Sequence, residues 1–128
     1  MVCIAETPFG REPDLDVDIL NTELQRYNRL AQRAATAKGA DFIDVWPVFT
    51  ATAEQLAGWA DATPPPGQLW CDGAHLSELG DALMLRLVRQ HLESTGAIDA
   101  LTTYDLLDRT DAQRAYAELL DDLKPDEL

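Results

Sequence analysis

The apolar positions of the chain form a short continuous run at its beginning, followed by several stripes at helical spacing. Val2 to Ala5 are apolar throughout and are followed at once by Glu6, Thr7 and Pro8. A short apolar run with such an ending is typical of a strand buried on both faces in a parallel sheet. The sequence therefore predicts a β-strand over residues 2–5, with a polar loop after it.

A long amphipathic helix is predicted next, opening near Asp16 to Asp18. Its apolar stripe recurs at steps of three and four and consists of Leu20, Leu24, Tyr27, Ala31 and Ala34. Charged residues lie off this stripe, so we expect the stripe to pack against the protein core and the opposite face to be exposed to solvent. Gly39 suits the end of the helix, and residues 41–46 then predict a second strand closed by Pro47. Strand, helix and strand make a βαβ unit with a right-handed crossover.

The next part of the chain predicts two helices separated by a loop. A short helix is expected over residues 52–61, and the segment TPPPG at residues 63–67 predicts a turn-rich loop. Ser77 can cap the following helix, which should pack on the sheet and end near Gly96. The apolar stripe of that helix consists of Leu76, Leu79, Leu83, Leu87 and Leu92.

The C-terminal part predicts helices without further strands. A short helical piece is expected around residues 101–107, and Thr110 and Gln113 have capping-box spacing at the start of a final helix. The apolar face of that final helix consists of Ala112, Tyr116, Leu119 and Leu123. Pro125 discourages its continuation.

Two predicted strands are too few for a stable parallel sheet. A parallel pair with one crossover helix has two open edges and too little cover on its faces. Either the C-terminal helices close a small α-rich domain around the strands, or the chain is the latter part of a larger α/β fold whose first strands lie upstream. The second alternative is the more economical.

Composition narrows the class of protein. A chain of 128 residues with 46% apolar residues suits one globular unit and argues against disorder. Ten Lys and Arg against 23 Asp and Glu give a net charge of -13, which would repel phosphate backbones and anionic lipid headgroups. We therefore expect neither nucleic acid nor membrane as a partner. The acidity is strongest near the C-terminus, where Asp121, Asp122, Asp126 and Glu127 predict a solvated segment.

Cysteine content and hydropathy say less about the compartment. Cys3 and Cys71 could form at most one bridge, and a buried free thiol is the usual state in an apolar run such as that around Cys3. No run approaches the length of a transmembrane helix or the core of a signal peptide. The compartment is therefore unknown, and cytoplasmic by default.

Candidate chemistry is concentrated in the stretch CDGAHLSELG at residues 71–80. A neutral imidazole can take a proton from a hydroxyl only if one ring nitrogen faces it while an acceptor holds the other. The turn from Asp72 to His75, relaxed by Gly73, can fold the carboxylate back beneath the imidazole. One loop would then deliver a general base together with the group that orients it.

This stretch resembles the last conserved block of the SGNH (GDSL-type) ester hydrolases, DGxHxxxxG. Asp72, Gly73, His75 and Gly80 all fall on that pattern, and the residues after Gly80 continue its helix. Upstream, three further features are similar to the second half of that family. These are the Thr and Pro loop after the first strand, Tyr27 with Asn28 on the helix, and Asp44 with Val45 at the end of the second strand.

The resemblance covers residues 2–92 and implies a fold. It implies α/β architecture, namely part of a flavodoxin-like three-layer sandwich with a short parallel sheet, plus C-terminal helices. Residues 1–96 would be the C-terminal part of an SGNH hydrolase-like domain, and residues 97–128 an acidic helical extension. The extension resembles no family.

The resemblance also implies an activity, the hydrolysis of an ester such as an acyl or acetyl group on a carbohydrate or small molecule. Asp72 would orient His75, and His75 would act as base and then as acid, without a metal or organic cofactor. The family's serine and its oxyanion-hole Gly and Asn come from blocks that this chain lacks. Ser77 and Ser94, the only serines, do not match the nucleophile, so we expect the chain alone to be inert.

Several alternatives remain open. The chain could be a non-catalytic scaffold that binds a protein partner through the acidic residues 97–128, or a half-enzyme completed by another polypeptide. Taken alone, Asp72 and His75 could form an ordinary Asx-type turn ahead of a helix. A thiol nucleophile at Cys71 is disfavoured because adjacent residues of an extended segment point to opposite sides. A metal site built from Asp72, His75 and Glu78 lacks further ligands.

Overall fold

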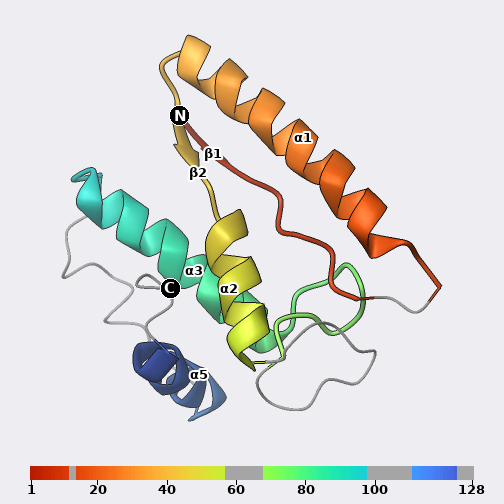
Figure 1. Cartoon of the computed structure of the whole chain (residues 1–128). Coiled ribbons are helices and arrows are strands. Elements are labelled where there is room, and N and C mark those ends of the chain that lie inside the picture. Colours follow the sequence, from red (N-terminus) through yellow and green to blue (C-terminus); the bar gives the residue numbers. More distant parts are fainter. Residues whose placement is uncertain (12–13, 57–67, 98–110, 124–128) are drawn as a thin grey trace.

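The architecture is mixed α/β (Figure 1). A computed structural model describes residues 1–11, 14–56, 68–97 and 111–123. These residues form four helices and a two-stranded parallel sheet, in which β1 (Val2–Ile4) pairs with β2 (Asp41–Ile43). Val2 lies opposite Asp41 and Ile4 opposite Ile43. Helix α1 (Val17–Ala37) connects the two strands, so the predicted parallel βαβ unit is confirmed.

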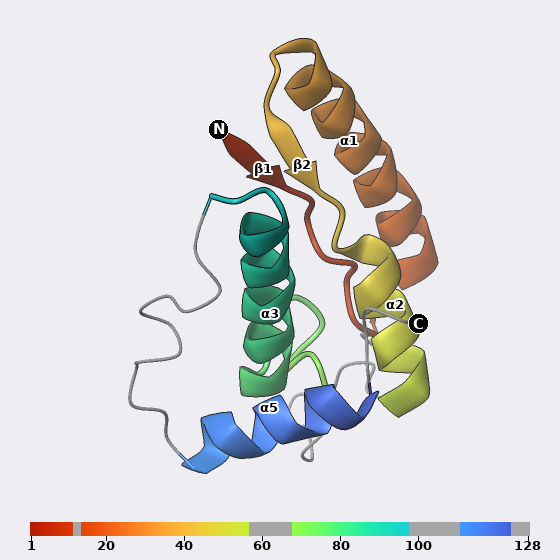
Figure 2. The same ribbon diagram turned by 90° about the vertical axis from the view of Figure 1, so that its left-hand side faces the viewer.

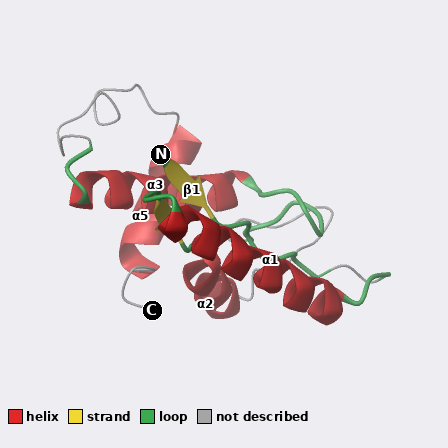
Figure 3. Ribbon diagram, turned by 90° about the horizontal axis from the view of Figure 1, so that it is seen from above, coloured by secondary structure: helices red, strands yellow, loops and turns green. Residues whose placement is uncertain are grey.

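The strands lie between two helices (Figure 2). Helix α1 covers one side of the pair and α3 (Glu78–Ser94) the other, while α2 (Trp46–Leu56) follows β2 and α5 (Asp111–Leu123) crosses α3. Figure 3, seen from above, shows β1 between α1 and α3. The buried core between these elements consists of Ala5, Ile43, Val45, Phe49, Ala53, Leu69, Trp70, Leu79, Leu83 and Leu120. None of the helices in the described ranges has both the length and the apolar character needed to span a bilayer.

The packing face of α1 differs from the predicted stripe. Asn28 and Ala35 are the buried residues of this helix, whereas Leu20 is 36% and Tyr27 66% exposed. Of the predicted stripe, Ala31 and Ala34 are also exposed, and only Leu24 is partly buried. The predicted packing face of α1 was therefore wrong. The observed face is related to it by a rotation of the helix about its axis.

Two asparagine side chains explain this rotation. The side-chain amide of Asn28 donates to the carbonyl of Glu6 and accepts its backbone N–H, both at 2.9 Å. Asn21 does the same to Phe9, accepting its N–H at 2.7 Å and donating to its carbonyl at 3.1 Å. Residues seven apart lie on the same helix face, so α1 binds the segment after β1 much as a neighbouring strand would.

Helix α2 begins earlier than its sequence pattern indicates. The predicted strand over residues 41–46 ends at Ile43, and the helix starts at Trp46 instead of Thr52. The carboxylate of Asp44 accepts the backbone N–H of Trp46 at 3.2 Å. Pro47 then occupies the first turn, where its fixed φ suits a helix and its missing N–H costs nothing. The predicted end of this helix lies outside the described residues.

The remaining helix ends agree with the sequence. Asp16 caps α1 by accepting the N–H of Ile19, and Gly39 follows its end with a φ of 70°. Ser77 caps α3 by accepting the N–H of Gly80 at 3.1 Å, and Gly96 follows with a φ of 74°. These caps confirm the predicted bounds of both helices.

Helices α3 and α5 pack together at the side of the sheet. The predicted stripe of α3 is confirmed by the full burial of Leu79 and Leu83. On α5, Tyr116 and Leu119 are partly buried around Leu120, which the prediction did not name. Arg86 and Asp121 form an ion pair between the two helices.

Three predictions lie outside the described residues. They are the loop over residues 63–67, the helical piece around residues 101–107 and the cap at Thr110.

Helix α3 runs opposite to the strands. His91, in its last turn, places its Nε2 atom 3.5 Å from the carboxylate of Asp41 at the start of β2. This contact places the carboxyl end of α3 beside the start of β2. The amino end of α3, with the segment before it, therefore lies at the carboxyl end of the sheet.

Replacing Asn28 with alanine tests the attachment of α1. We expect Asn28→Ala to lower the free energy of unfolding by about 2–3 kcal/mol, because two hydrogen bonds disappear and the backbone groups of Glu6 lose their partners. Urea denaturation measures the change. The matched control is Gln32→Ala on the same helix, where an exposed side chain should matter by less than about 0.5 kcal/mol. Equal effects of the two substitutions would contradict this account.

Candidate active site

The residues singled out by their spacing lie on a short loop that closes on itself. Trp70 and Leu76 form an antiparallel bridge, and the N–H of Cys71 donates to the carbonyl of His75 at 2.9 Å. At the base of the loop, Trp70 is fully buried and its ring packs against Phe49 with a centroid separation of 6.2 Å. Trp70 is thus a core residue, and it fixes the loop to the body of the protein.

Asp72 and His75 form the pair that the sequence predicts. One carboxylate oxygen of Asp72, Oδ2, lies 2.7 Å from Nδ1 of His75. The other, Oδ1, accepts the backbone N–H groups of Ala74 at 2.7 Å and His75 at 2.6 Å. Both oxygens are therefore bound within the same turn. The predicted closeness of carboxylate and imidazole is confirmed, while the catalytic role stays a prediction.

These hydrogen bonds favour the ionised carboxylate. The backbone N–H of His75, then that of Ala74, then the imidazole lower the pKa of Asp72 from its usual 3.8 to about 2. The bonds therefore contribute stability above pH 3.8, which is lost as the pH falls through about 2. At neutral pH, Asp72 is a charged acceptor whose position is fixed by its own loop.

The imidazole itself is open to solvent. The side chain of His75 is 79% exposed, against 45% for Asp72. Because Nδ1 faces the carboxylate, Nε2 is the nitrogen that can accept a proton from an incoming group. A base oriented by a carboxylate and open on its other side can activate a hydroxyl or a water molecule.

The loop is joined to the segment that follows β1. The N–H of Gly10 donates to the carbonyl of Gly73 at 2.9 Å, one residue after Phe9, which Asn21 binds. Asp72 and His75 therefore lie at the carboxyl end of the parallel strands. In open α/β sheets this is the end at which ligands bind.

Gly80 has a steric role in this arrangement. A Cβ atom at Gly80 would lie 2.2 Å from the carbonyl oxygen of Leu69, a backbone atom. The same stretch is held by the N–H of Ser77, which donates to that carbonyl at 3.0 Å. The first turn of α3 can approach the base of the loop only because residue 80 has no side chain.

The two serine hydroxyls and the thiol of Cys71 bind backbone carbonyls and do not face the imidazole of His75. Ser77 donates its hydroxyl to the carbonyl of Gln68 and accepts the N–H of Gly80, and Ser94 donates to the carbonyl of His91. The thiol of Cys71 lies 3.5 Å from the carbonyl of His75 and 3.6 Å from that of Leu76. Both cysteines are free thiols. Glu78 does not join Asp72 and His75 in any group of three possible metal ligands within the described residues.

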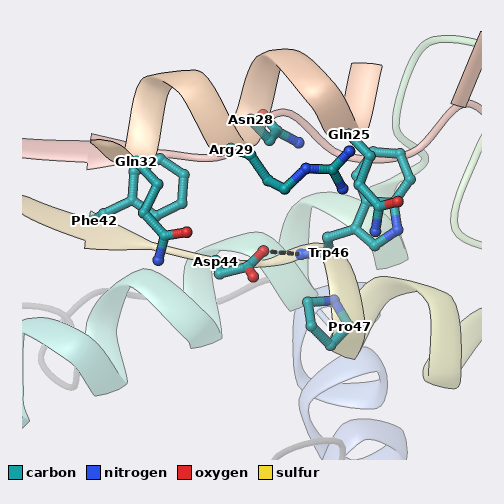
Figure 4. A pocket seen from close by; sticks show the side chains of 8 residues that line it. All are labelled: Gln25, Asn28, Arg29, Gln32, Phe42, Asp44, Trp46 and Pro47. Atoms are coloured by element: carbon teal, nitrogen blue, oxygen red, sulfur yellow. Dashed lines mark hydrogen bonds between the residues drawn. The ribbon is translucent and has the colours of Figure 1, made fainter. Parts of the chain in front are cut away.

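A second candidate site lies between α1 and β2 (Figure 4). It is a hollow of about 200 Å³, lined by Gln25, Asn28, Arg29, Gln32, Phe42, Asp44, Trp46 and Pro47. Asp72 and His75 do not line it. The sequence analysis missed this hollow, although Gln25, Arg29 and Gln32 recur at helical spacing and could have indicated a polar flank.

Comparisons of the chain with protein-family models, with curated proteins and with solved structures give no match.

The origin of the low pKa of Asp72 can be tested with one substitution. We expect His75→Ala to leave the pKa of Asp72 well below 3.8, because the two largest causes are backbone N–H groups that alanine retains. A carboxyl-carbon NMR titration of wild type and variant measures this pKa. A return to the usual value in the variant would show that the imidazole, and not the turn, holds the carboxylate.

The close approach at Gly80 predicts a cost for any side chain there. Gly80→Ala should lower the free energy of unfolding by about 1–3 kcal/mol, because the loop base or the helix must shift. It should also change the NMR shifts of Asp72 and His75. The comparison is Gly39→Ala, where nothing lies within 4 Å of the added Cβ. That variant should show only the backbone cost of a positive φ and leave the site unchanged.

Proposed function

We propose that Asp72 and His75 are the acid–base part of an SGNH-type ester hydrolase whose nucleophilic serine comes from residues outside this chain or from another polypeptide. The observation that carries the proposal is the 2.7 Å contact between the Asp72 carboxylate and Nδ1 of a His75 ring that is otherwise exposed. Its support from the sequence is the DGxHxxxxG pattern. The substrate class would be an acyl or acetyl ester of a carbohydrate or small molecule.

Each residue has a defined part in the reaction. Nε2 of His75 takes the proton of the serine hydroxyl while the oxygen attacks the ester carbonyl, and Asp72 stabilises the imidazolium that forms. The imidazolium then gives this proton to the leaving alcohol, which leaves an acyl-serine. A water molecule, deprotonated by the same nitrogen, releases the acid and restores the serine.

The proposed fold is a flavodoxin-like sandwich of which this chain carries the latter part. Two features support it: the βαβ unit, and the position of the Asp72–His75 loop beside the carboxyl end of β1. Residues 1–96 would belong to the hydrolase-like domain, and residues 97–128 to an acidic extension. Without a serine beside His75 the chain alone should be inert, since removal of a triad nucleophile commonly costs about 10⁶ in turnover number.

The alternative is a non-catalytic scaffold that binds a protein partner through the acidic C-terminal residues. On α5, Leu120 is buried and Asp121 is paired with Arg86, so this face already binds α3. A partner would have to meet the opposite face, where Glu118 and Asp122 are exposed. No observation favours such a partner over the hydrolase proposal.

The test is an assay of the chain joined to its preceding reading frame, or mixed with a polypeptide that carries the serine. With a chromogenic acetate ester, His75→Ala should lower the turnover number by about 10⁶. The matched control is His91→Ala, which removes the other histidine, far from the loop, and should retain activity.

Two results would contradict the proposal. One is undiminished hydrolysis in the His75→Ala variant. The other is labelling of Ser77 or Ser94 by a fluorophosphonate in the chain alone, because both hydroxyls are bound to backbone carbonyls and should stay unreactive.

A further inference from the structure

The hollow between α1 and β2 combines apolar rings with polar side chains. The rings of Phe42, Trp46 and Pro47 supply its apolar lining. Asn28, only 8% exposed, is a fixed part of the wall, because both ends of its amide are bound to the backbone of Glu6. The remaining polar lining consists of Gln25, Arg29, Gln32 and Asp44 (Figure 4).

These polar side chains are not used up by one another. Among the eight lining residues, all of which the structure describes, only the side chain of Asp44 is hydrogen-bonded to another of them (Figure 4). Its Oδ1 accepts the N–H of Trp46 at 3.2 Å, which fixes the carboxylate and leaves Oδ2 toward the hollow. Gln25, Arg29 and Gln32 are exposed, so their donors and acceptors are available to a ligand in place of water.

The hollow lies where a strand of the parallel sheet ends. Asp44 and Trp46 follow directly on Ile43, the last residue of β2. In open α/β sheets, ligands bind beyond the carboxyl ends of the strands. The Asp72–His75 loop is joined to the segment after β1 and does not line the hollow, so the hollow is a separate site.

Size and charge restrict the class of ligand. A volume of about 200 Å³ is less than the roughly 300–1,000 Å³ of pockets for drug-sized molecules, so the occupant is a molecule or group of about one ring. The lining carries one positive charge, on Arg29, and one negative charge, on Asp44. It therefore selects neither an anion nor a cation.

We infer that the hollow binds a single pyranose ring of a carbohydrate. A pyranose has an apolar C–H face, which packs on the Trp46 ring, and a rim of hydroxyls that each donate and accept. Oδ2 of Asp44 accepts from a hydroxyl, Arg29 donates, and the two glutamine amides can do both. The inference goes beyond the proposed hydrolysis and rests on the hollow alone.

An amino acid zwitterion, the other ligand without net charge, fits less well. Its carboxylate would bind Arg29 and its ammonium Asp44, and both of these side chains are exposed. Exposed ion pairs contribute little, because water and salt screen them. A small zwitterion would also leave the two glutamine amides and the aromatic rings without a role.

The experiment is an NMR titration of the full chain with the methyl β-glycosides of glucose, galactose and mannose, each a single neutral pyranose. We expect at least one of them to shift the indole N–H signal of Trp46 and the side-chain amide signals of Gln25 and Gln32, with a Kd of about 1–10 mM. The signals of Gly73 and His75 should stay unchanged. Because the ligand is uncharged, raising the salt from about 0.05 to 0.5 M should change the Kd by less than about twofold.

Three variants make the test specific. Arg29→Ala and Gln32→Ala each remove a hydrogen-bonding group from the hollow, and each should weaken glycoside binding by about five- to tenfold. Asp44→Asn keeps an oxygen for the N–H of Trp46 but removes the charge, so glycoside binding should stay within about threefold. The matched control is Arg33→Ala, an exposed arginine of α1 outside the hollow, which should leave binding within about twofold.

Four outcomes would overturn the inference. The first two are no shift at Trp46 with any of the three glycosides up to about 50 mM, and shifts at Gly73 and His75 in place of Trp46. The third is an equal Kd for Arg29→Ala and Arg33→Ala. The fourth is binding of glycine that is tighter than that of every glycoside and is lost in Asp44→Asn, which would assign the hollow to a zwitterion.

The titration is independent of the esterase assay, because it involves no hydrolysis and no serine. A failed esterase assay with intact glycoside binding would remove the proposed function alone. Ester hydrolysis without glycoside binding at Trp46 would remove this inference alone.

Discussion

The structure depends on how two asparagine side chains hold the backbone that leaves β1. Asn21 and Asn28 each bind both the donor and the acceptor of one residue, Phe9 and Glu6 respectively. These bonds replace the ladder that the strand gives up when it ends, and they set the rotation of α1 over the sheet. The rotation turns the flank with Gln25, Arg29 and Gln32 toward the hollow. The same clamp positions Gly10, which joins the Asp72–His75 loop.

The sequence predicts those features that depend on neighbouring residues in the chain. The caps at Asp16 and Ser77, the glycines after α1 and α3, and the pairing of Asp72 with His75 all follow from residues close together in the chain. The two strands follow from short apolar runs, and their parallel pairing follows from the helix predicted between them. The sequence could not predict the packing face of α1, because Asn21 and Asn28 look like solvent-facing residues until their backbone partners are known. The early start of α2 was missed for a similar reason, since Pro47 was taken to end a strand when it opens a helix.

Burial differs between the two strands of the sheet. On the α3 side, Leu79, Leu83 and Ile43 share a closed core. Around β1, Val2, Ile4 and Tyr27 remain exposed although their residue types favour burial. The apolar stripe that the sequence indicated on α1 is therefore mostly surface, and of its members only Leu24 is partly buried.

The bridge between Trp70 and Leu76 makes the geometry of the pair a local property. Asp72 is held by N–H groups of its own turn, and the ends of that turn are tied to each other before either meets the rest of the protein. The alignment of the Asp72 carboxylate with the His75 imidazole is therefore fixed within residues 70–76. The two side chains thus owe their mutual alignment to the loop itself and not to the packing of the helices around it.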